Sequence, residues 1–340
     1  MRKSYLFITI FILFTSSIFF SPLAPAKDIL TTQNLDKLEQ YLTDRSASFT
    51  IGRTAATKIP LSRLCGLKVP QHENESIFHP GTSPQDYSAL PEHFDWRSEA
   101  GCPPIRNQLS CGACWAFATI APLETNILIH SGKLVDLSEQ WLLSCNSNGW
   151  NCSGGWWAHD FHLSPGGVPE TEYPYNGYVS DCSEPGIHSF KIKDWGYVSD
   201  MEFGIPQVEE IKKAVLEHGP VSCGVYVGNA FRAYSGGVFN ISESGSEIVN
   251  HAVTIVGWDD SLQGGSWIIR NSWGSDWGHA GYMYIKYGVS NIGYSSNYIV
   301  YDPGIVFSEI RVNDDKYGNG NNLMDPGESV FMNILLENDS

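Results

Sequence analysis

An α+β fold is predicted for this chain, and three features of the sequence support the prediction. The first half carries apolar residues at the three- and four-residue spacing of amphipathic helices. The second half carries short apolar or alternating runs separated by glycine-rich turns, as β-strands do. The chain has 340 residues, 13% of them aromatic, so it can bury a large core. Helices and strands segregated in this way are typical of the α+β class.

The chain begins with the features of a secretory signal peptide. Arg2 and Lys3 precede a mostly apolar run over 5–20, and the segment ends in Ala24-Pro25-Ala26. We therefore expect a signal peptide over 1–26 and a secreted, extracellular protein, or one in a periplasmic or lysosome-like compartment. An uncleaved anchor is the alternative, although the run is slightly shorter than the roughly 20 residues that a membrane span needs. No later apolar run is as long, so we expect no membrane contact after cleavage.

The segment 27–89 differs in composition from the residues that follow it. Leu35, Leu38 and Leu42 recur at helical spacing and predict a short amphipathic helix over 33–45. Stretches rich in Ser, Thr and Pro come next, without a long period. This change in composition sets the segment apart from the main domain.

The stretch 108–117 carries the residues on which the functional prediction depends. Cys111 and Cys114 are separated by Gly-Ala and followed by a tryptophan. Cys114 begins a run with helical spacing that Pro122 should kink, so its thiol would lie at a helix N-terminus. Unpaired N–H groups and the helix dipole favour a thiolate there, and the thiolate is the nucleophilic form. A redox or metal-binding C-x-x-C pair is the alternative, but the sequence has no second C-x-x-C.

Other elements are indicated by their ends and by their spacing. A helix is predicted over 137–145, with Asp136 or Ser138 as its N-cap. A second helix is predicted over 206–218, with Pro206 at its first position and a Gly-Pro pair after its end. Short strands are predicted over 221–227, 252–258, 267–270 and 282–287.

The stretch around Cys114 resembles the active-site signature of the papain family of cysteine proteases. Three further motifs match the family in the right order: Leu137-Ser138-Glu139-Gln140, Asn250-His251-Ala252-Val253 and Asn271-Ser272-Trp273-Gly274. His251 follows Cys114 within the family's range of about 130–150 residues, and Asn271 lies slightly beyond it. The resemblance covers about residues 90–300. It implies a two-lobed fold with a helical N-terminal lobe, a β-barrel-like C-terminal lobe and an active site in the cleft between them.

The resemblance implies a complete catalytic set. Cys114 would be the nucleophile, held as a thiolate beside a protonated His251. His251 would protonate the leaving amine and then activate water, while Asn271 orients the imidazole ring. Gln108 and the backbone N–H of Cys114 would donate to the oxyanion, where one such donor is worth roughly 3 kcal/mol. Trp273 would cover the bond between His251 and Asn271, and no metal or other cofactor is implied.

The resemblance also implies a substrate cleft with an apolar pocket for the second residue before the cleaved bond. The substrate-binding residues that it implies are Gly154, Gly155, Trp156, Trp157, Val249, Asn250, Ala252, Ser295 and Trp273. The two glycines would pair with the substrate backbone, and Ser295 would lie at the bottom of the pocket. Asn250 stands where many relatives carry an aspartate, and we expect it to point toward the rim. His159 and His162 are expected to be surface or packing residues.

Eight cysteines and an oxidising compartment allow disulfide bonds. The resemblance implies the pairs Cys111–Cys152 and Cys145–Cys182, while Cys114 must stay free. Cys65 falls within 27–89. Cys102 and Cys223 then remain in the mature domain, and we expect these two to pair.

The sequence thus predicts a secreted cysteine endopeptidase over 90–302, made as a zymogen with residues 27–89 as an inhibitory propeptide. Its partners would be polypeptide substrates and its own propeptide, and we expect a monomer. The net charge of −16 argues against nucleic acid as a partner. Two alternatives are a catalytically inactive binding module on the same fold and an acyl-transferase of the transglutaminase type. The first would lack one of the four catalytic residues, and the second typically has an aspartate where Asn271 stands.

The resemblance to the papain family ends near Asp302. Residues 303–340 resemble the first strands and turn of an immunoglobulin-like β-sandwich module, and about 38 residues are too few for a stable sandwich. The segment is therefore either the start of such a module or a C-terminal extension that docks on the protease. The oxygen-rich turn over 314–328 could bind calcium, but its spacing is not that of an EF-hand loop.

Overall fold

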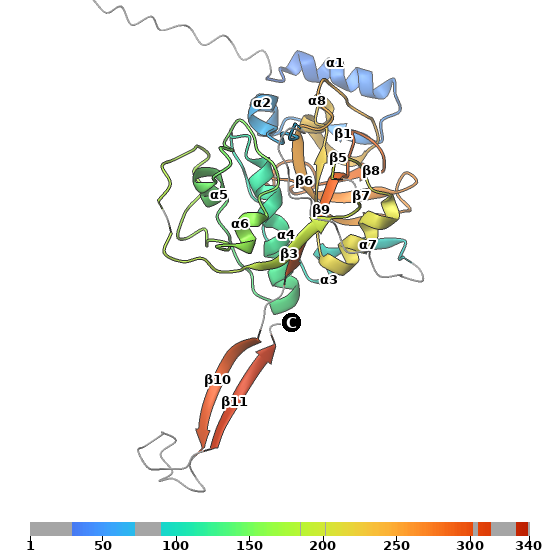
Figure 1. Ribbon diagram of the computed structural model, residues 1–340. Coiled ribbons are helices and arrows are strands. Elements are labelled where there is room, and N and C mark those ends of the chain that lie inside the picture. The colour runs from blue at the N-terminus through green and yellow to red at the C-terminus, as the bar shows by residue number, and fades with distance from the viewer. Residues whose placement is uncertain are drawn as a thin grey trace, which may run out of the picture.

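The computed structural model describes residues 29–71, 90–183, 185–200 and 202–301, together with the backbone of two strands at 305–313 and 331–338. The predicted signal peptide and the turn over 314–328 lie outside these residues. Helices α4, α5 and α6 gather on one side of the molecule, and the large sheet lies on the other (Figure 1). The predicted α+β fold is confirmed.

The described residues form eight α-helices and one short 3₁₀ helix, η1 (Ala56–Lys58). The α-helices are α1 (Thr32–Thr43), α2 (Leu61–Leu64), α3 (Trp96–Glu99), α4 (Cys114–Ser131), α5 (Glu139–Cys145), α6 (Asp160–Leu163), α7 (Val208–His218) and α8 (Asn229–Ala233). The expected helix over 206–218 thus begins two residues late, because Gln207 is its N-cap and forms a capping box with Glu210. Ser138 caps α5 by accepting from the backbone N–H of Trp141.

Nine strands form one open sheet in the order β1-β5-β8-β7-β6-β4-β9-β3, with β2 paired to β6. They are β1 (Phe49–Ile51), β2 (His93–Asp95), β3 (Ile192–Tyr197), β4 (Val221–Val225), β5 (Tyr234–Phe239), β6 (His251–Asp259), β7 (Ser266–Arg270), β8 (Tyr282–Lys286) and β9 (Tyr294–Tyr301). The end strands β1 and β3 do not pair with each other, so the sheet stays open where a barrel-like lobe was expected. All four predicted strands are present, within one or two residues of their predicted ends.

Helix α4 is the buried axis of the helical side. It is apolar nearly all round and buried from Cys114 to Ile127, as a helix inside a core must be. It runs on through Pro122, which cannot donate to the carbonyl of Ala118 one turn earlier. The hydroxyl of Ser222 in β4 donates to that carbonyl instead. The polar group that proline leaves unpaired is therefore satisfied from the sheet, and the helix packs directly against it.

The N-terminal segment packs against the sheet side of the molecule. Leu35 and Leu42 on α1 are buried, and strand β1 pairs antiparallel with β5. Phe49 of β1 stacks near Tyr234 and Phe239, with its ring centroid 4.6 Å from that of Phe239. After α2 the chain passes the first residue of α4, because the N–H of Gly66 lies 3.2 Å from Sγ of Cys114. The segment therefore reaches the region of Cys114 with its backbone already anchored to the sheet.

Two of the three expected disulfides are present and one is absent. Cys111 is bonded to Cys152, and Cys145 to Cys182. The prediction that Cys102 pairs with Cys223 is wrong, because both are free. Cys223 is fully buried in β4 opposite Val253 of β6, whereas Cys102 lies in a loop beside Tyr282 at the start of β8. The prediction of this pair depended only on these two cysteines remaining in the mature domain, and the structure leaves both unbonded.

Strands β10 (Ile305–Asn313) and β11 (Phe331–Asn338) pair antiparallel in a separate two-stranded sheet. This hairpin projects from the body of the molecule (Figure 1). Its assignment to an immunoglobulin-like module stays a prediction.

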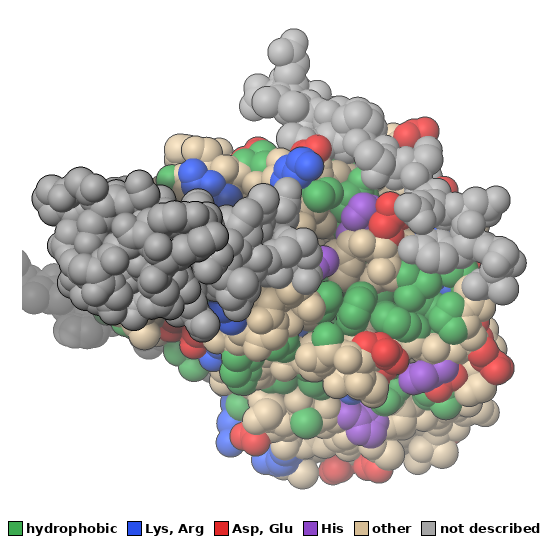
Figure 2. Space-filling view, turned by 90° about the horizontal axis from the view of Figure 1, so that it is seen from below, with side chains coloured by type: hydrophobic (Ala, Val, Ile, Leu, Met, Phe, Trp, Pro, Cys, Tyr) green, Lys and Arg blue, Asp and Glu red, His purple; other side chains and the backbone are tan. Residues whose placement is uncertain are grey.

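On the face seen from below, acidic and basic side chains are interspersed with apolar ones (Figure 2). Among the described residues, no helix combines the length and the apolar character that crossing a membrane requires.

Candidate active site

Three elements bring the predicted catalytic residues together. Cys114 is the first residue of α4, His251 is the first of β6, and Asn271 directly follows β7. The Oδ1 atom of Asn271 lies 2.9 Å from Nε2 of His251 and accepts a hydrogen bond from the Nε2–H group. The sulfur of Cys114 interacts with the backbone N–H of Ala252, the neighbour of His251. The imidazole and the amide are thus bonded, and the thiol lies beside the strand residue that follows His251.

Trp273 lies where the resemblance placed it. Its ring centroid is 4.7 Å from that of His251, and both side chains are almost fully buried. Phe231 adds a second ring, with its centroid 5.9 Å from that of Trp273. The bond between His251 and Asn271 is therefore shielded from solvent, which strengthens an electrostatic interaction.

Burial acts on both members of the predicted pair in the intact chain. It raises the pKa of the Cys114 thiol to about 11, against opposing backbone N–H donors. It lowers the pKa of His251 to about 4, although the bond to Asn271 opposes this shift. Burial therefore favours the neutral form of both groups while Gly66 lies on Cys114. The thiolate–imidazolium pair stays a prediction for the uncovered site.

The backbone of residues 64–68 lies directly on the catalytic residues. The N–H of Gly66 is 3.2 Å from Sγ of Cys114. The N–H of Leu67 donates to the carbonyl of Asn250 at 3.0 Å. Gly155 donates to the carbonyl of Gly66 and accepts from the N–H of Lys68, both at 2.9 Å. The predicted pairing edge at Gly155 is thus already engaged by a peptide backbone from the same chain.

Gln108 lies beside this segment with its amide orientation fixed. Its Nε2 donates to the carbonyl of Leu64 at 2.9 Å and to that of Cys111 at 2.7 Å. Its Oε1 accepts from the hydroxyl of Ser272 at 2.7 Å. A peptide carbonyl therefore occupies the position where the sequence placed the oxyanion.

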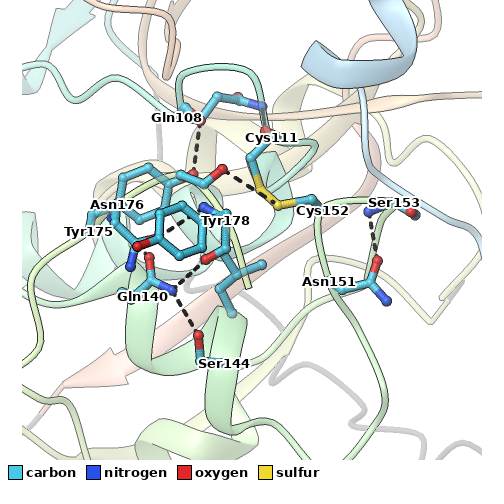
Figure 3. The surroundings of a disulfide bond; sticks show 12 residues. Gln108, Cys111, Gln140, Ser144, Asn151, Cys152, Ser153, Tyr175, Asn176 and Tyr178 are labelled. Atoms are coloured by element: carbon cyan, nitrogen blue, oxygen red, sulfur yellow. Dashed lines mark hydrogen bonds between the residues drawn. A yellow bond between two sulfur atoms is a disulfide. The ribbon is translucent and has the colours of Figure 1, made fainter. Parts of the chain in front are cut away.

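The loop that carries Gln108 is held by the disulfide Cys111–Cys152 and by its surroundings (Figure 3). Tyr175 donates through its hydroxyl to the backbone carbonyl of Gln108 at 2.9 Å. The disulfide joins the loop before α4 to the segment that leads to Gly154 and Gly155. The oxyanion donor and the backbone-pairing edge are therefore tied to each other covalently.

Leu67 fills the pocket predicted for the second residue before the cleaved bond. It is 1% exposed and packs in one buried cluster with the predicted wall residues Trp157, Val249 and Ala252. Trp157 donates through Nε1 to the hydroxyl of Ser295 at 3.1 Å, so both belong to this region. The side chains that cluster with Leu67 are apolar, and their role as a substrate pocket stays a prediction.

Two other predicted substrate-binding residues are held by contacts within the protein. The amide of Asn250 pairs with both the N–H and the carbonyl of Val227, at 2.8 and 3.0 Å, and the residue is partly exposed. Trp156 is buried, with its ring centroids 5.0 Å from Trp157 and 6.1 Å from Phe203. Trp156 therefore packs against the predicted wall residue Trp157.

Sequence reasoning missed several residues of the site. Leu64, Gly66 and Leu67 carry no motif, and only their place before the mature domain could have drawn attention to them. Ser272 lies within the Asn271-Ser272-Trp273-Gly274 motif, which does not indicate the bond from its hydroxyl to Gln108. Tyr294 joins the cluster around the pocket from β9, a strand that the sequence did not predict.

His159 and His162 are packing residues and are not on the surface. Both are almost fully buried, and His159 bonds through Nε2 to Asn297 at 2.7 Å. Within the described part of the chain, no group of three or more His, Cys, Asp or Glu side chains could hold a metal ion.

Comparison with known proteins supports the same conclusion. The family model described as "Papain family cysteine protease" matches residues 90–301 of this chain. Fruit bromelain from Ananas comosus is 33% identical over 268 residues, which cover 76% of this chain and 73% of that protein. Senescence-specific cysteine protease SAG12 from Arabidopsis thaliana is 39% identical over 203 residues, 58% of this chain and only 57% of the length of that relative.

Solved structures agree with the sequence matches. Digestive procathepsin L2 proteinase from the Tenebrio molitor larval midgut has a TM-score of 0.70 at 26% identity, over 79% of this chain and 89% of that one. The matched structure is of a proform, and the coverage includes more of this chain than the family match does. On these grounds the chain belongs to the papain family of cysteine proteases.

Proposed function

We propose that this protein is a secreted cysteine endopeptidase, made as a zymogen and inhibited by residues 27–89. The observation that carries the proposal is the peptide backbone in the cleft. Its Leu64 carbonyl accepts from Gln108, and the adjoining Gly66 N–H rests on Cys114. A cleft that holds one peptide in this way has the donors and acceptors needed to hold another. The similarity to a procathepsin supports the assignment of a propeptide.

Departure of the covering segment would activate the catalytic pair. Water would then reach Cys114 and His251 and remove the burial that keeps both neutral. The proton of the thiol passes to His251, and the thiolate attacks the carbonyl carbon of the substrate. The carbonyl oxygen becomes an oxyanion and accepts from Nε2 of Gln108, whose orientation Ser272 fixes.

The remaining steps use the same residues. His251 gives its proton to the leaving amine as the carbon–nitrogen bond breaks, which leaves an acyl group on the sulfur of Cys114. Water then loses a proton to His251 and attacks the thioester, releasing the acid and the thiol. Asn271 keeps the imidazole oriented through both proton transfers.

The covering segment resists cleavage because of what it presents to the nucleophile. An N–H group, not a carbonyl carbon, faces the sulfur of Cys114. The segment also pairs with Gly155 in the parallel sense. Its presence keeps the thiol in its less nucleophilic, protonated form.

The filled pocket indicates which substrates the enzyme prefers. Leu67 is enclosed by apolar side chains and by Ala252, so Leu, Val, Phe or Tyr would gain about 25 cal/mol per Å² of buried apolar surface there. An Arg, Asp or Glu would lose its hydration without a charged partner. We expect these three to be rejected at the second position before the cleaved bond.

Two variants test the assignment of the catalytic residues. Cys114→Ala should remove peptidase activity while the protein still folds, because the nucleophile is lost. Asn271→Ala should retain weak activity, because only the orientation of His251 is lost. Activity is measured on a peptide with leucine at the second position, and an activity-based epoxide probe followed by peptide mapping should label Cys114. Full hydrolysis by Cys114→Ala, or labelling elsewhere, would refute the assignment.

A further inference from the structure

The residue that follows Leu67 contacts an acidic side chain across the cleft. Lys68 donates its backbone N–H to Gly155, and its Nζ lies 3.1 Å from Oε1 of Glu247. Both side chains are about half exposed, at 53% and 48%. The stem of Lys68 packs on Gly154, where a Cβ would collide with it. Lys68 therefore spans the groove from the glycine edge on one side to Glu247 on the other.

The loop that carries Glu247 is anchored on both sides of this residue. The backbone N–H of Glu243 donates to the hydroxyl of Ser290 at 3.0 Å. Asn291 donates through Nδ2 to the carbonyl of Ile248 at 2.8 Å. The carboxylate is thus presented from a fixed backbone, although its own side chain is exposed.

The charges around this groove change when residues 27–89 leave. Its described lining contains three charged side chains, Arg63, Lys68 and Glu247. Arg63 and Lys68 belong to the departing segment, so Glu247 remains as the charged member of the lining. The other lining residues from the mature domain are Cys152, Ser153, Ser246 and Asn250. An acidic position without a basic partner is then left beside the glycine edge.

The place of Lys68 corresponds to the third residue before the cleaved bond. Leu67 marks the pocket for the second residue, and Lys68 is the next residue along the Gly155 edge, beyond Gly66 at Cys114. A substrate with an apolar side chain in the same pocket would place its next residue, on the side away from the cleaved bond, over the same edge.

We propose that Glu247 makes this enzyme select Lys or Arg at the third residue before the cleaved bond. The proposal rests on the proposed peptidase function and extends it to a second specificity position. The pair would be exposed, and exposed ion pairs contribute little, so a preference of about two- to fivefold is expected. Such a preference weakens as salt is added.

The test compares three peptides that share leucine at the second position and differ at the third, which is Lys, norleucine or Glu. Norleucine matches the stem of lysine without its charge. With the processed enzyme, kcat/KM should be about two- to fivefold higher for Lys than for norleucine, and lowest for Glu. In Glu247→Gln the ratio of kcat/KM for the Lys peptide to that for the norleucine peptide should fall to about one. In Glu247→Lys the Glu peptide should have a higher kcat/KM than the Lys peptide.

Glu209→Gln is the matched control. It removes the same charge from an exposed position on α7, which contacts β9, β6 and β4 and does not line the groove. This variant should keep the preference of the unmodified enzyme. Equal kcat/KM for Lys and norleucine peptides in the unmodified enzyme, or an undiminished preference in Glu247→Gln, would overturn the inference while leaving the peptidase assignment intact. Failure to hydrolyse any of the three peptides would overturn both.

Discussion

Gly66 determines how closely the covering segment approaches the nucleophile. A Cβ on this residue would overlap the backbone carbonyl of Gly112, which cannot move aside as a side-chain tip could. The same residue places its N–H on Cys114 and its carbonyl on Gly155. An alanine at this position should therefore lift the backbone off the sulfur and admit water to the catalytic pair.

Gly66→Ala is expected to expose Cys114 in the uncleaved chain. Overpacking of this kind costs about 1–3 kcal/mol, so an epoxide probe should label Cys114 roughly tenfold faster or more. Labelling is measured by mass spectrometry on chains that are still intact. Ser62→Ala, an exposed position in the same segment, should behave like the unmodified chain. Equal labelling rates for Gly66→Ala and the unmodified chain would show that Gly66 does not hold the segment in place.

The predicted catalytic residues could be named from the sequence because each lies in a distinctive motif. The structure bonds His251 to Asn271 and places the sulfur of Cys114 at the backbone of Ala252. Their charge state could not be found in the same way, because it depends on burial by residues 64–68, which carry no motif. The bond from Ser272 to Gln108 joins residues distant in the chain, and no local pattern indicates it.

Elements with clear periodicity were predicted, whereas two strands with polar or glycine residues at consecutive positions were not. Helix α7 has an apolar face between a capping residue and a terminating glycine. Strand β9 is buried on both faces, yet Ser295 and Asn297 within it are polar and fully buried, so no apolar pattern appears. Strand β5 contains Gly236 and Gly237, and two consecutive glycines are typical of a turn. In both cases the tertiary surroundings determine the strand.

Ser222 connects the sheet to the proline-containing helix. Its hydroxyl donates to the carbonyl of Ala118, which Pro122 leaves without its helical donor. Removing the hydroxyl would leave a buried acceptor unpaired, at a cost of about 1–3 kcal/mol. Ser222→Ala should lower the free energy of unfolding of the intact chain by about this amount.

Thr125→Val is the matched control for Ser222→Ala. The Thr125 hydroxyl also donates to a helix carbonyl, that of Ala121. In a regular helix this carbonyl has a second donor, the backbone N–H of Thr125, so it would not be left unpaired. The control should therefore cost less than Ser222→Ala. Urea unfolding of both variants measures the difference, and equal losses would mean that the carbonyl of Ala118 does not depend on Ser222.

At the scale of the molecule, the predicted propeptide and the protease domain share one sheet. Strand β1 extends the sheet at β5, so release of residues 27–89 would leave β5 as an edge strand. The same release would uncover Cys114. A single segment provides both the edge strand and the backbone in the cleft, so the proposed inhibition would depend on sheet pairing as well as on the contacts at Cys114.

Buried titratable groups make opposite contributions to the stability of the molecule as pH changes. Burial raises the pKa of Glu124 to about 7, partly opposed by Arg270 and the N–H of Leu137. The pKa of Glu124 in the folded chain lies above its ordinary value of 4.5. Its stabilising contribution to the free energy of unfolding is therefore present at low pH and is lost as the pH rises toward 7. Burial also lowers the pKa of His162 to about 3, below the ordinary 6.5. The contribution of His162 is therefore present above pH 6.5 and is lost as the pH falls.

His162 provides the cleaner test of this pH dependence. It is 1% exposed on α6, neither ring nitrogen has a hydrogen-bond partner, and the nearby His159 opposes its protonation. His162→Leu should remove up to about 1.4 kcal/mol per pH unit of acid-induced loss in the free energy of unfolding, between pH 6.5 and 4. Urea unfolding of the intact chain at a series of pH values measures the slope, and comparison with the unmodified chain cancels the contribution of Glu124. A slope in His162→Leu equal to that of the unmodified chain would mean that the imidazole accepts its proton without leaving the folded core.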